Sequence, residues 1–256
     1  MIEIEGLKKR FGQSIALDEV SMHVRDGAMY GFVGPNGAGK TTTIRCMMGL
    51  LAADGGKLLI NGIDMEKEPK KALSQIGYIP DDFGVYDNLK VLEYMEFFAS
   101  CYGITGLSAR KRSMTLLDQV GLEGKSDFYV DSLSKGMKQR LCLARALVHN
   151  PSILIMDEPT AGLDVEARNE ILDMLRAYIA EDESRSILIT SHISTDLESL
   201  CDELYLIHDG KLILHEGTDA ILEQYGILKV SEEQYRTLDQ SSILKVQKEN
   251  YGYACF

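Results

Sequence analysis

One nine-residue stretch constrains the fold of this chain more than any other. It fits the pattern G-x-x-x-x-G-K-S/T at every fixed position, and its residues are Gly34, Pro35, Asn36, Gly37, Ala38, Gly39, Lys40, Thr41 and Thr42. The apolar run before it, residues 28–33, predicts a buried strand, and residues 42–50 predict a helix. A strand, such a loop and a helix in that order indicate a phosphate-binding loop in an α/β fold.

The residue types in this loop suit a nucleoside triphosphate. Its glycines let successive backbone N–H groups point at phosphate oxygens, and the N-terminus of the next helix adds partial positive charge. Lys40 can reach the β- and γ-phosphates, and the Thr41 hydroxyl can ligate Mg²⁺. The structural alternative is a glycine-rich turn with a chance Gly-Lys-Thr, which would explain neither the spacing nor the flanking elements.

Length and charge exclude several classes of protein. A chain of 256 residues forms one large domain, or one domain with small attachments. The formal net charge of −12 argues against a nucleic-acid binder, which usually carries a basic face. The short basic runs at 8–10 and 110–112 are more typical of solvated surfaces.

The chain also lacks sequence signals for membrane insertion or export. No apolar run approaches the roughly 20 residues of a membrane-spanning helix. The acidic, alternating N-terminus is unlike a signal peptide. The five cysteines are scattered and show no metal-type pairing, which favours a reducing cytoplasm.

The rest of the chain alternates between strand-like and helix-like segments. Residues 2–24 predict antiparallel strands with one wet face, and residues 88–122 predict helices inserted between two βα segments. Asn-Gly at 61–62 and Asp-Gly at 209–210 predict hairpin turns. Ser134 is the expected N-cap of a further helix. Residues 218–256 predict a small appendage with strands at 227–230 and 243–246 and a helix at 232–238.

Polar side chains follow two of the predicted buried strands. Asp157 and Glu158 come directly after the apolar run 153–156, and His192 follows the run 186–190. Ligands bind at the carboxyl ends of strands in open α/β sheets. Asp157 is therefore expected to hold Mg²⁺ through water, Glu158 to polarise an attacking water as general base, and His192 to hydrogen-bond the γ-phosphate. A lone histidine is more often a structural residue.

In their order along the chain, these motifs resemble the nucleotide-binding subunit of ATP-binding cassette (ABC) transporters over roughly residues 1–217. The resemblance implies a P-loop ATPase fold with a RecA-like core sheet, an N-terminal antiparallel β subdomain and a helical subdomain at about 84–150. It implies ATP and Mg²⁺ as cofactors. The implied nucleotide- and metal-binding residues outside the phosphate loop are Phe11, Asp81, Ser134, Lys135, Gly136, Asp157 and Asp164.

The resemblance assigns a role to each of these positions. Phe11 would stack on adenine, although a core phenylalanine is an equal alternative. Thr41, Asp81 and Asp157 would hold Mg²⁺, and Lys40, Glu158 and His192 would be catalytic. The remaining positions, Ser134, Lys135, Gly136 and Asp164, would meet the ATP held by a second subunit. The implied assembly is a homodimer or heterodimer that ATP closes and hydrolysis releases.

Two motifs depart from the usual family pattern. The signature L-S-G-G-Q reads L-S-K-G-M at residues 133–137, and Asp81 stands where a glutamine is usual. Both departures resemble the branch that serves ABC-2-type exporters, in which the membrane permease is a separate chain. The expected protein is an ATPase motor on the cytoplasmic face of the cell membrane, with no nucleic acid as partner. The alternatives are a soluble cassette ATPase acting on nucleic acid or ribosomes, and a cassette that binds ATP without hydrolysing it.

Overall fold

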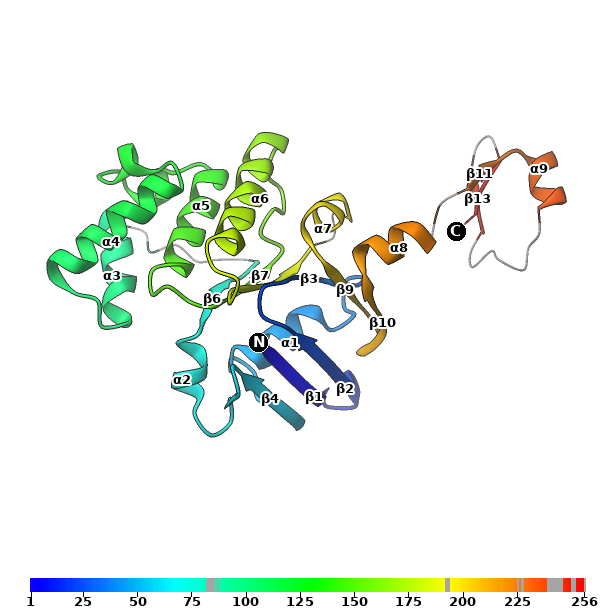
Figure 1. The fold of residues 1–256 in the computed structure, drawn as a ribbon, viewed down its shortest axis with the longest axis horizontal. Coiled ribbons are helices and arrows are strands. Elements are labelled where there is room, and N and C mark those ends of the chain that lie inside the picture. Colours follow the sequence, from blue (N-terminus) through cyan, green and yellow to red (C-terminus); the bar gives the residue numbers. More distant parts are fainter. Residues whose placement is uncertain are drawn as a thin grey trace. The chain divides into compact units, whose positions relative to one another are not determined.

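A computed structural model describes residues 1–81, 86, 88–191, 194–224, 226, 228–238, 246–249 and 252–255. The chain divides into two compact units, Met1–His215 and Glu216–Phe256, and each is described by itself (Figure 1). The phosphate loop and the two acidic residues after the buried strand all lie in the first unit.

The first unit contains an antiparallel sheet that agrees with the predicted strands of the N-terminal region. Apolar side chains alternate along its strands and pack into the core, so one face of the sheet is buried and the other is exposed to solvent. Asn61 and Gly62 both have positive φ and turn the chain between the last two strands, which confirms the predicted hairpin. In spatial order the strands are β2 (Ser14–Val24), β1 (Ile2–Phe11), β4 (Gly55–Ile60) and β5 (Ile63–Asp64).

A six-stranded sheet forms the centre of the first unit. Its strands β6, β7, β8, β3 and β9 pair in parallel, and β7 and β8 are buried along their whole length. Strands buried along their whole length are expected where helices or a second sheet cover both faces. The spatial order is β10 (Lys211–Gly217), β9 (Glu203–His208), β3 (Met29–Val33), β8 (Ser186–Thr190), β7 (Ile153–Asp157) and β6 (Ile76–Ile79).

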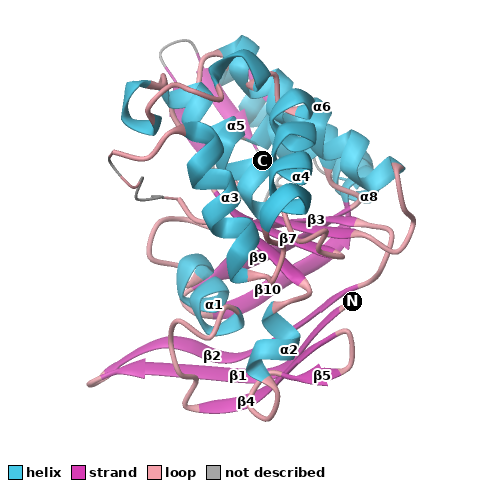
Figure 2. Ribbon diagram, turned by 90° about the vertical axis from the view of Figure 1, so that its left-hand side faces the viewer, coloured by secondary structure: helices cyan, strands magenta, loops and turns pink. Residues whose placement is uncertain are grey.

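Helices separate and cover the two sheets (Figure 2). The helix after the phosphate loop, α1 (Lys40–Met47), lies between them, and its Ile44 and Met47 are buried in a cluster with residues of both sheets. On the other side of the six-stranded sheet lie α6 (Val165–Ala180) and α7 (Ser194–Leu200), the latter not predicted from the sequence. The short α2 (Pro69–Leu73) begins at a proline, as expected.

A helical segment is inserted between β6 and β7. It has a hydrophobic cluster of its own, which includes Tyr94, Leu117 and Leu141. Ser134 caps its last helix by accepting a hydrogen bond from the backbone N–H of Met137 at 3.3 Å, as predicted. Its elements are α3 (Val91–Cys101), α4 (Gly106–Gln119), the 3₁₀ turns η1 (Glu123–Lys125) and η2 (Val130–Ser132), and α5 (Lys135–Ala146).

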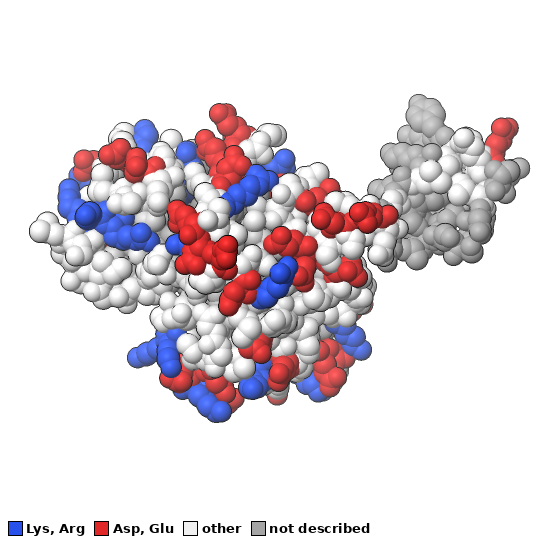
Figure 3. Space-filling model, viewed as in Figure 1, with Lys and Arg blue, Asp and Glu red and all other residues white. Residues whose placement is uncertain are grey.

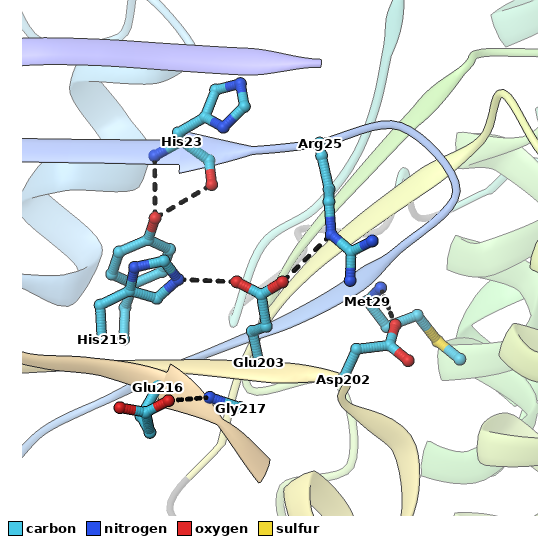
Figure 4. A network of polar contacts seen from close by, with 9 residues as sticks. His23, Arg25, Met29, Asp202, Glu203, His215, Glu216 and Gly217 are labelled. Carbon is cyan, nitrogen blue, oxygen red and sulfur yellow. Dashed lines mark hydrogen bonds and ion pairs between the residues drawn. The ribbon is translucent and has the colours of Figure 1, made fainter. Parts of the chain in front are cut away.

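A polar network joins the edges of the two sheets (Figure 4). The Glu203 carboxylate accepts from Arg25 Nε at 3.1 Å and lies 2.7 Å from His215 Nε2. The Tyr205 hydroxyl accepts from the backbone N–H of His23 and donates to its carbonyl, both at 3.0 Å. Burial opposes ionisation of Glu203, but the hydrogen bonds from His215 and Tyr30 and the charge of Arg25 keep its pKa below the ordinary value.

The second unit is a small sheet with helices. The predicted helix at 232–238 is present, and Tyr235 on it stacks on Tyr253 with ring centroids 4.4 Å apart. The last strand, β13, and the first helix, α8, were not predicted, and of the strand expected at 243–246 only Val246 is described, as the first residue of β12. The elements are α8 (Thr218–Gln224), β11 (Leu228–Val230), α9 (Glu232–Thr237), β12 (Val246–Glu249) and β13 (Gly252–Cys255), with strand order β11-β13-β12.

Candidate functional site

The phosphate loop leaves β3 and turns sharply into α1. A side chain at position 34 would place its Cβ 2.3 Å from the carbonyl oxygen of Ile207, so only glycine fits there. Gly39 has φ 115° and forms the N-cap of α1, a conformation that residues with a side chain avoid. The loop therefore requires both glycines. Gly34 is required because β9 lies so close, and Gly39 because α1 begins there.

Lys40 lies inside this turn rather than in solvent. Its side chain is buried, and its ammonium donates to the carbonyl oxygens of Gly34 at 2.6 Å and Pro35 at 3.3 Å. Among the described residues no carboxylate lies within ion-pair distance of it. Thr41 follows in the first turn of α1 and is exposed. A cation held by carbonyls, beside the helix N-terminus and an exposed hydroxyl, fits a triphosphate.

Asp157 and Glu158 leave the sheet together at the end of β7. Asp157 is 1% exposed, and its Oδ1 accepts a hydrogen bond from the Thr190 hydroxyl at 2.7 Å. The same hydroxyl accepts the backbone N–H of Glu158 at 2.9 Å. Thr190 ends the neighbouring strand β8, where it is the register partner of Asp157. One threonine side chain thus holds both acidic residues in place.

Glu158 has an uncommon backbone conformation. Its φ is 52°, a left-handed value that costs a residue with a side chain about 1–3 kcal/mol and persists only where the surrounding structure imposes it. Here the Glu158 N–H is directed at Thr190, and its carbonyl accepts from the N–H of Ala161 at 3.1 Å. The chain therefore leaves the strand in a turn at Glu158 that these two hydrogen bonds hold.

Asp81 lies at the same edge as Asp157. Strands β6 and β7 are parallel neighbours with Ile79 opposite Met156, so Asp81 follows the end of one strand and Asp157 ends the other. Both carboxylates act on the phenol of Tyr78. Burial, the Asp157 charge and, more weakly, the Asp81 charge raise the pKa of Tyr78 to about 12.

The signature segment and the loop before α6 lie side by side within one subunit. Ser134 and Asp164 cap α5 and α6, and Asp164 accepts from the N–H of Ala167 at 2.8 Å. A Cβ on Gly136 would lie 3.2 Å from that of Ala167, and one on Gly162 would lie 2.4 Å from Lys135 Nζ. The lysine that replaces the usual glycine therefore places its ammonium over Gly162.

Phe11 and His192 are the remaining predicted site residues. Phe11 ends β1 with a side chain that is 53% exposed, and Lys9 Nζ lies 5.6 Å from its ring centroid. The core alternative for Phe11 is therefore wrong, and its ring is available for stacking. His192 lies outside the described residues, while Ser191 before it is buried at the end of β8.

Sequence reasoning missed two residues that organise this region. Thr190 is one, and Asp196 on α7 is the other. Asp196 is 2% exposed and accepts from the Thr160 hydroxyl at 2.8 Å, with Arg168 Nε 3.4 Å away. It thereby ties the loop after Glu158 to the helix after the histidine position. Asp196 lies six positions beyond the end of β8, and nothing in its sequence neighbourhood signals such a contact.

Comparison with known proteins identifies the family. A family model described as ABC transporter matches residues 17–161, which include the phosphate loop, the signature segment and the strand-end acids. The chain belongs to the ABC transporter family. It is an ATP-binding cassette with ATPase activity, and the predicted fold is confirmed.

Relatives and solved structures agree with this assignment. This ABC cassette is 38% identical over 235 residues to the Nod factor export ATP-binding protein I of Ralstonia nicotianae, covering 88% of this chain and 73% of the relative. It is 36% identical to the linearmycin resistance ATP-binding protein LnrL of Bacillus subtilis, covering 83% and 68%. None of these comparisons supports the nucleic-acid alternative.

Solved structures of cassettes superpose closely on this one. An ATP-binding subunit of an ABC transporter gives a TM-score of 0.79 at 30% identity, covering 88% of this chain and 92% of that chain. A dimeric cassette in a post-hydrolysis state with ADP and phosphate gives 0.78 at 25% identity, covering 85% and 99%. Nucleotide binding and hydrolysis are thus established for the family to which this ABC cassette belongs.

Proposed function

We propose that this ABC cassette is the motor subunit of an exporter and works at the cytoplasmic face of the cell membrane through a separate permease. Relatives named for Nod factor export and linearmycin resistance support the export direction. In the described part of the chain, no helix is long and apolar enough to cross a membrane. Acidic side chains are spread over the face in Figure 3, with basic ones interspersed among them.

The proposed nucleotide site uses the phosphate loop and the ends of β6 and β7. When bound, Mg²⁺ would be held by Thr41, Asp81 and Asp157 and would supply positive charge to neutralise the phosphates. The fit is favourable, because the buried Asp157 and the Thr41 hydroxyl are the kind of oxygen ligands Mg²⁺ prefers. No group of three or more His, Cys, Asp and Glu in the described chain is arranged for a metal, as expected when phosphates complete the coordination. Asp81 would be a further oxygen donor.

The proposed hydrolytic step rests on the geometry around Thr190. Glu158 would accept a proton from the attacking water, and its backbone N–H is held by Thr190 next to the buried Asp157. Lys40 would leave the carbonyls of Gly34 and Pro35 for the β- and γ-phosphates. His192 would hydrogen-bond the γ-phosphate. Phe11, exposed at the end of β1, would stack on the adenine.

The proposed active assembly has two subunits. Ser134, Lys135 and Gly136 at the start of α5 would face the γ-phosphate of the ATP held by the second subunit, and Asp164 would lie beside them. The dimeric cassette with ADP and phosphate, at 25% identity, supports such an assembly. The second subunit would be a copy of this chain, which gives a homodimer, or a related cassette, which gives a heterodimer.

The proposed binding site for the permease is a groove between the core and the helical segment. Its volume is about 270 Å³, and its lining combines Met48 and Leu50 after α1 with Phe98 on α3 and Tyr102 at the C-cap of that helix. Arg145 forms its base, donating to the Tyr94 hydroxyl at 3.0 Å and lying 5.2 Å from the ring centroid of Phe98. Leu50 is 66% exposed, an apolar side chain suited to a protein partner. From the sequence, Phe83, Val85, Tyr86 and Tyr94 are the candidates for this contact, with packing inside the helical subdomain as an equal alternative; of these, Phe83 and Val85 lie outside the described residues.

The test asks whether a tagged variant that hydrolyses ATP slowly captures the permease from membranes. Glu158→Gln protein with ATP and Mg²⁺ is incubated with detergent-solubilised native membranes, and bound proteins are identified by mass spectrometry. We expect a multi-spanning membrane protein in stoichiometric amount. Leu50→Glu should abolish its recovery, whereas Leu107→Glu, at an 86% exposed position on α4 outside the groove, should not. Recovery of only soluble protein or nucleic acid would contradict the exporter assignment.

Asp81 has a separate test because it departs from the family pattern. We infer that it keeps the coupling role of the usual glutamine while changing the metal geometry, since it is charged and one methylene shorter. Asp81→Ala should then lower both ATP turnover and its response to the permease, and Asp81→Gln should restore the response. Unchanged turnover and response in Asp81→Ala would refute this role.

A further inference from the structure

A small pocket lies among three helices, at the ends of α5 and α6 that are far from the ATP site. Its volume is about 190 Å³, and α4, α5 and α6, which lie side by side in Figure 1, provide most of its wall. The signature residues start α5 at Lys135, whereas the pocket is lined by Leu143 and Leu147 at its other end. At about 1.5 Å per residue, this separates the pocket from the signature by some 12–18 Å along the helix.

Arg112 provides one charged wall of this pocket. Its Nη2 donates to the carbonyl of Leu147 at 2.8 Å and its Nε to that of Val148 at 3.2 Å, so the guanidinium caps the end of α5. Two of its five N–H groups are used in this way. Within the described residues no carboxylate lies at ion-pair distance from it. Burial, and next the charge of Arg185, lower the pKa of Arg112, as expected for a cation that lacks a close counterion.

Arg185 provides a second guanidinium on the same pocket. It donates to Glu181 at 2.6 Å, to the carbonyl of Tyr178 at 3.0 Å and to Asn150 Oδ1 at 3.1 Å. Because Glu181 offsets one of the two positive charges, the pocket carries a net charge of about one. A monoanion therefore matches it better than a phosphate dianion.

Apolar side chains form a further part of the wall, which also includes the polar Gln119 and Asn150. Leu116 and Leu143 are almost completely buried, and Leu147 and Met174 are half-buried beside them. A volume of 190 Å³ equals about six water molecules at roughly 30 Å³ each. It therefore admits a molecule of about six to nine non-hydrogen atoms. Guanidinium groups and apolar side chains that line so small a space call for an amphiphilic anion.

We propose that this pocket binds a small monocarboxylate with a short apolar tail, its carboxylate on Arg112 and Arg185 and its tail on Leu116 and Leu143. Because α5 and α6 begin at the signature segment and at Asp164, the ligand would brace these two helices against each other. The site is separate from the nucleotide site, so ATP and the carboxylate bind together. The proposal does not depend on the exporter assignment.

The test uses hexanoate as the probe and ligand-observed NMR with the full chain. We expect a dissociation constant of about 1 mM, the affinity that eight non-hydrogen atoms can supply. Hexan-1-ol, with the same tail and no charge, should bind at least about tenfold more weakly. Excess ATP and Mg²⁺, added to Glu158→Gln protein, should leave the hexanoate affinity unchanged.

Two variants separate the pocket from other surfaces. Arg112→Gln should weaken hexanoate binding at least about tenfold, whereas Lys111→Gln, exposed on the same helix, should leave it unchanged. Ala177→Leu fills the pocket on α6 without removing a charge and should also abolish binding, which keeps the test valid if Arg112→Gln fails to fold. Equal binding of hexanoate and hexanol, full affinity in Ala177→Leu, or displacement by ATP would overturn the proposal.

Discussion

The hydroxyl of Thr190 donates a hydrogen bond of 2.7 Å to the carboxylate of Asp157, although the two residues are 33 positions apart in the chain. The parallel pairing of β7 and β8 brings them together as register partners. Since the same hydroxyl accepts the N–H of Glu158, one uncharged side chain positions both the proposed metal ligand and the proposed general base. Thr190 is therefore a positioning residue of the hydrolytic site.

Thr190→Val should slow ATP hydrolysis while ATP binding persists. The change keeps the size of the side chain but removes the hydroxyl that donates to the buried Asp157 carboxylate, at about 1–3 kcal/mol, while the N–H of Glu158 keeps the Thr190 carbonyl as acceptor at 3.2 Å. If the activation free energy of hydrolysis rises by a similar amount, kcat falls roughly ten- to hundredfold. Steady-state kinetics and labelled-ATP titration measure the two effects. Thr190→Ser, which retains the hydroxyl, should recover most of the rate, and a normal kcat in Thr190→Val would disprove the role.

Lys40→Ala should abolish ATP binding. The ammonium is buried under the loop at 2.6 Å from the Gly34 carbonyl, where it supplies the positive charge nearest to the proposed phosphates. Equilibrium titration with labelled ATP gives the affinity, and Lys70→Ala at an exposed position on α2 is the control. Unchanged affinity in Lys40→Ala would refute the assignment of the phosphate loop.

Glu158→Gln should bind ATP and remain dimeric. The amide keeps the shape of the side chain but no longer accepts a proton from water, so the sandwich forms and turnover is slow. Light scattering with ATP and Mg²⁺ gives the mass, and the wild-type protein without nucleotide is the reference. A monomer under all conditions would count against the two-subunit site.

Asp196→Ala should destabilise the fold by about 2 kcal/mol or more. It removes a carboxylate that is 2% exposed and leaves the Thr160 hydroxyl and Arg168 without their acceptor. Asp173→Ala is the matched control, because its pair with Arg176 is exposed and should contribute less than about 1 kcal/mol. Urea unfolding followed by circular dichroism gives both values. Equal stability of the two variants would show that Asp196 does not anchor the loop.

Stability should fall in the alkaline range. Burial raises the pKa of Tyr78 and of Tyr94 from 10 to about 12. Between these values the unfolded chain has released the phenolic protons that the folded protein retains, so the free energy of unfolding decreases as pH rises from about 10 to about 12. Urea unfolding across this range measures the slope. Tyr94→Phe should give a shallower slope, and a free energy independent of pH would contradict the argument.

Local chemistry made several features predictable from the sequence. The loop from Gly34 to Thr42, the Ser134 cap and the Asn61-Gly62 hairpin each depend on residues a few positions apart. The acids after β7 were predictable as well, because a run of apolar residues ends directly at Asp157. These features require only backbone conformations and hydrogen bonds that the residues concerned can make among themselves.

Tertiary structure decided which distant residues share the site. Three of its contacts join segments that are at least 33 residues apart. Thr190 bonds Asp157, Asp196 bonds Thr160, and Arg112 bonds the end of α5. The strand β13 exists because two other strands pair with it. Strand order and helix packing bring such residues together through burial of apolar surface over the whole unit, which no short segment encodes. The sequence alone thus determined the chemistry of the ATPase, and the fold determined how its residues are held.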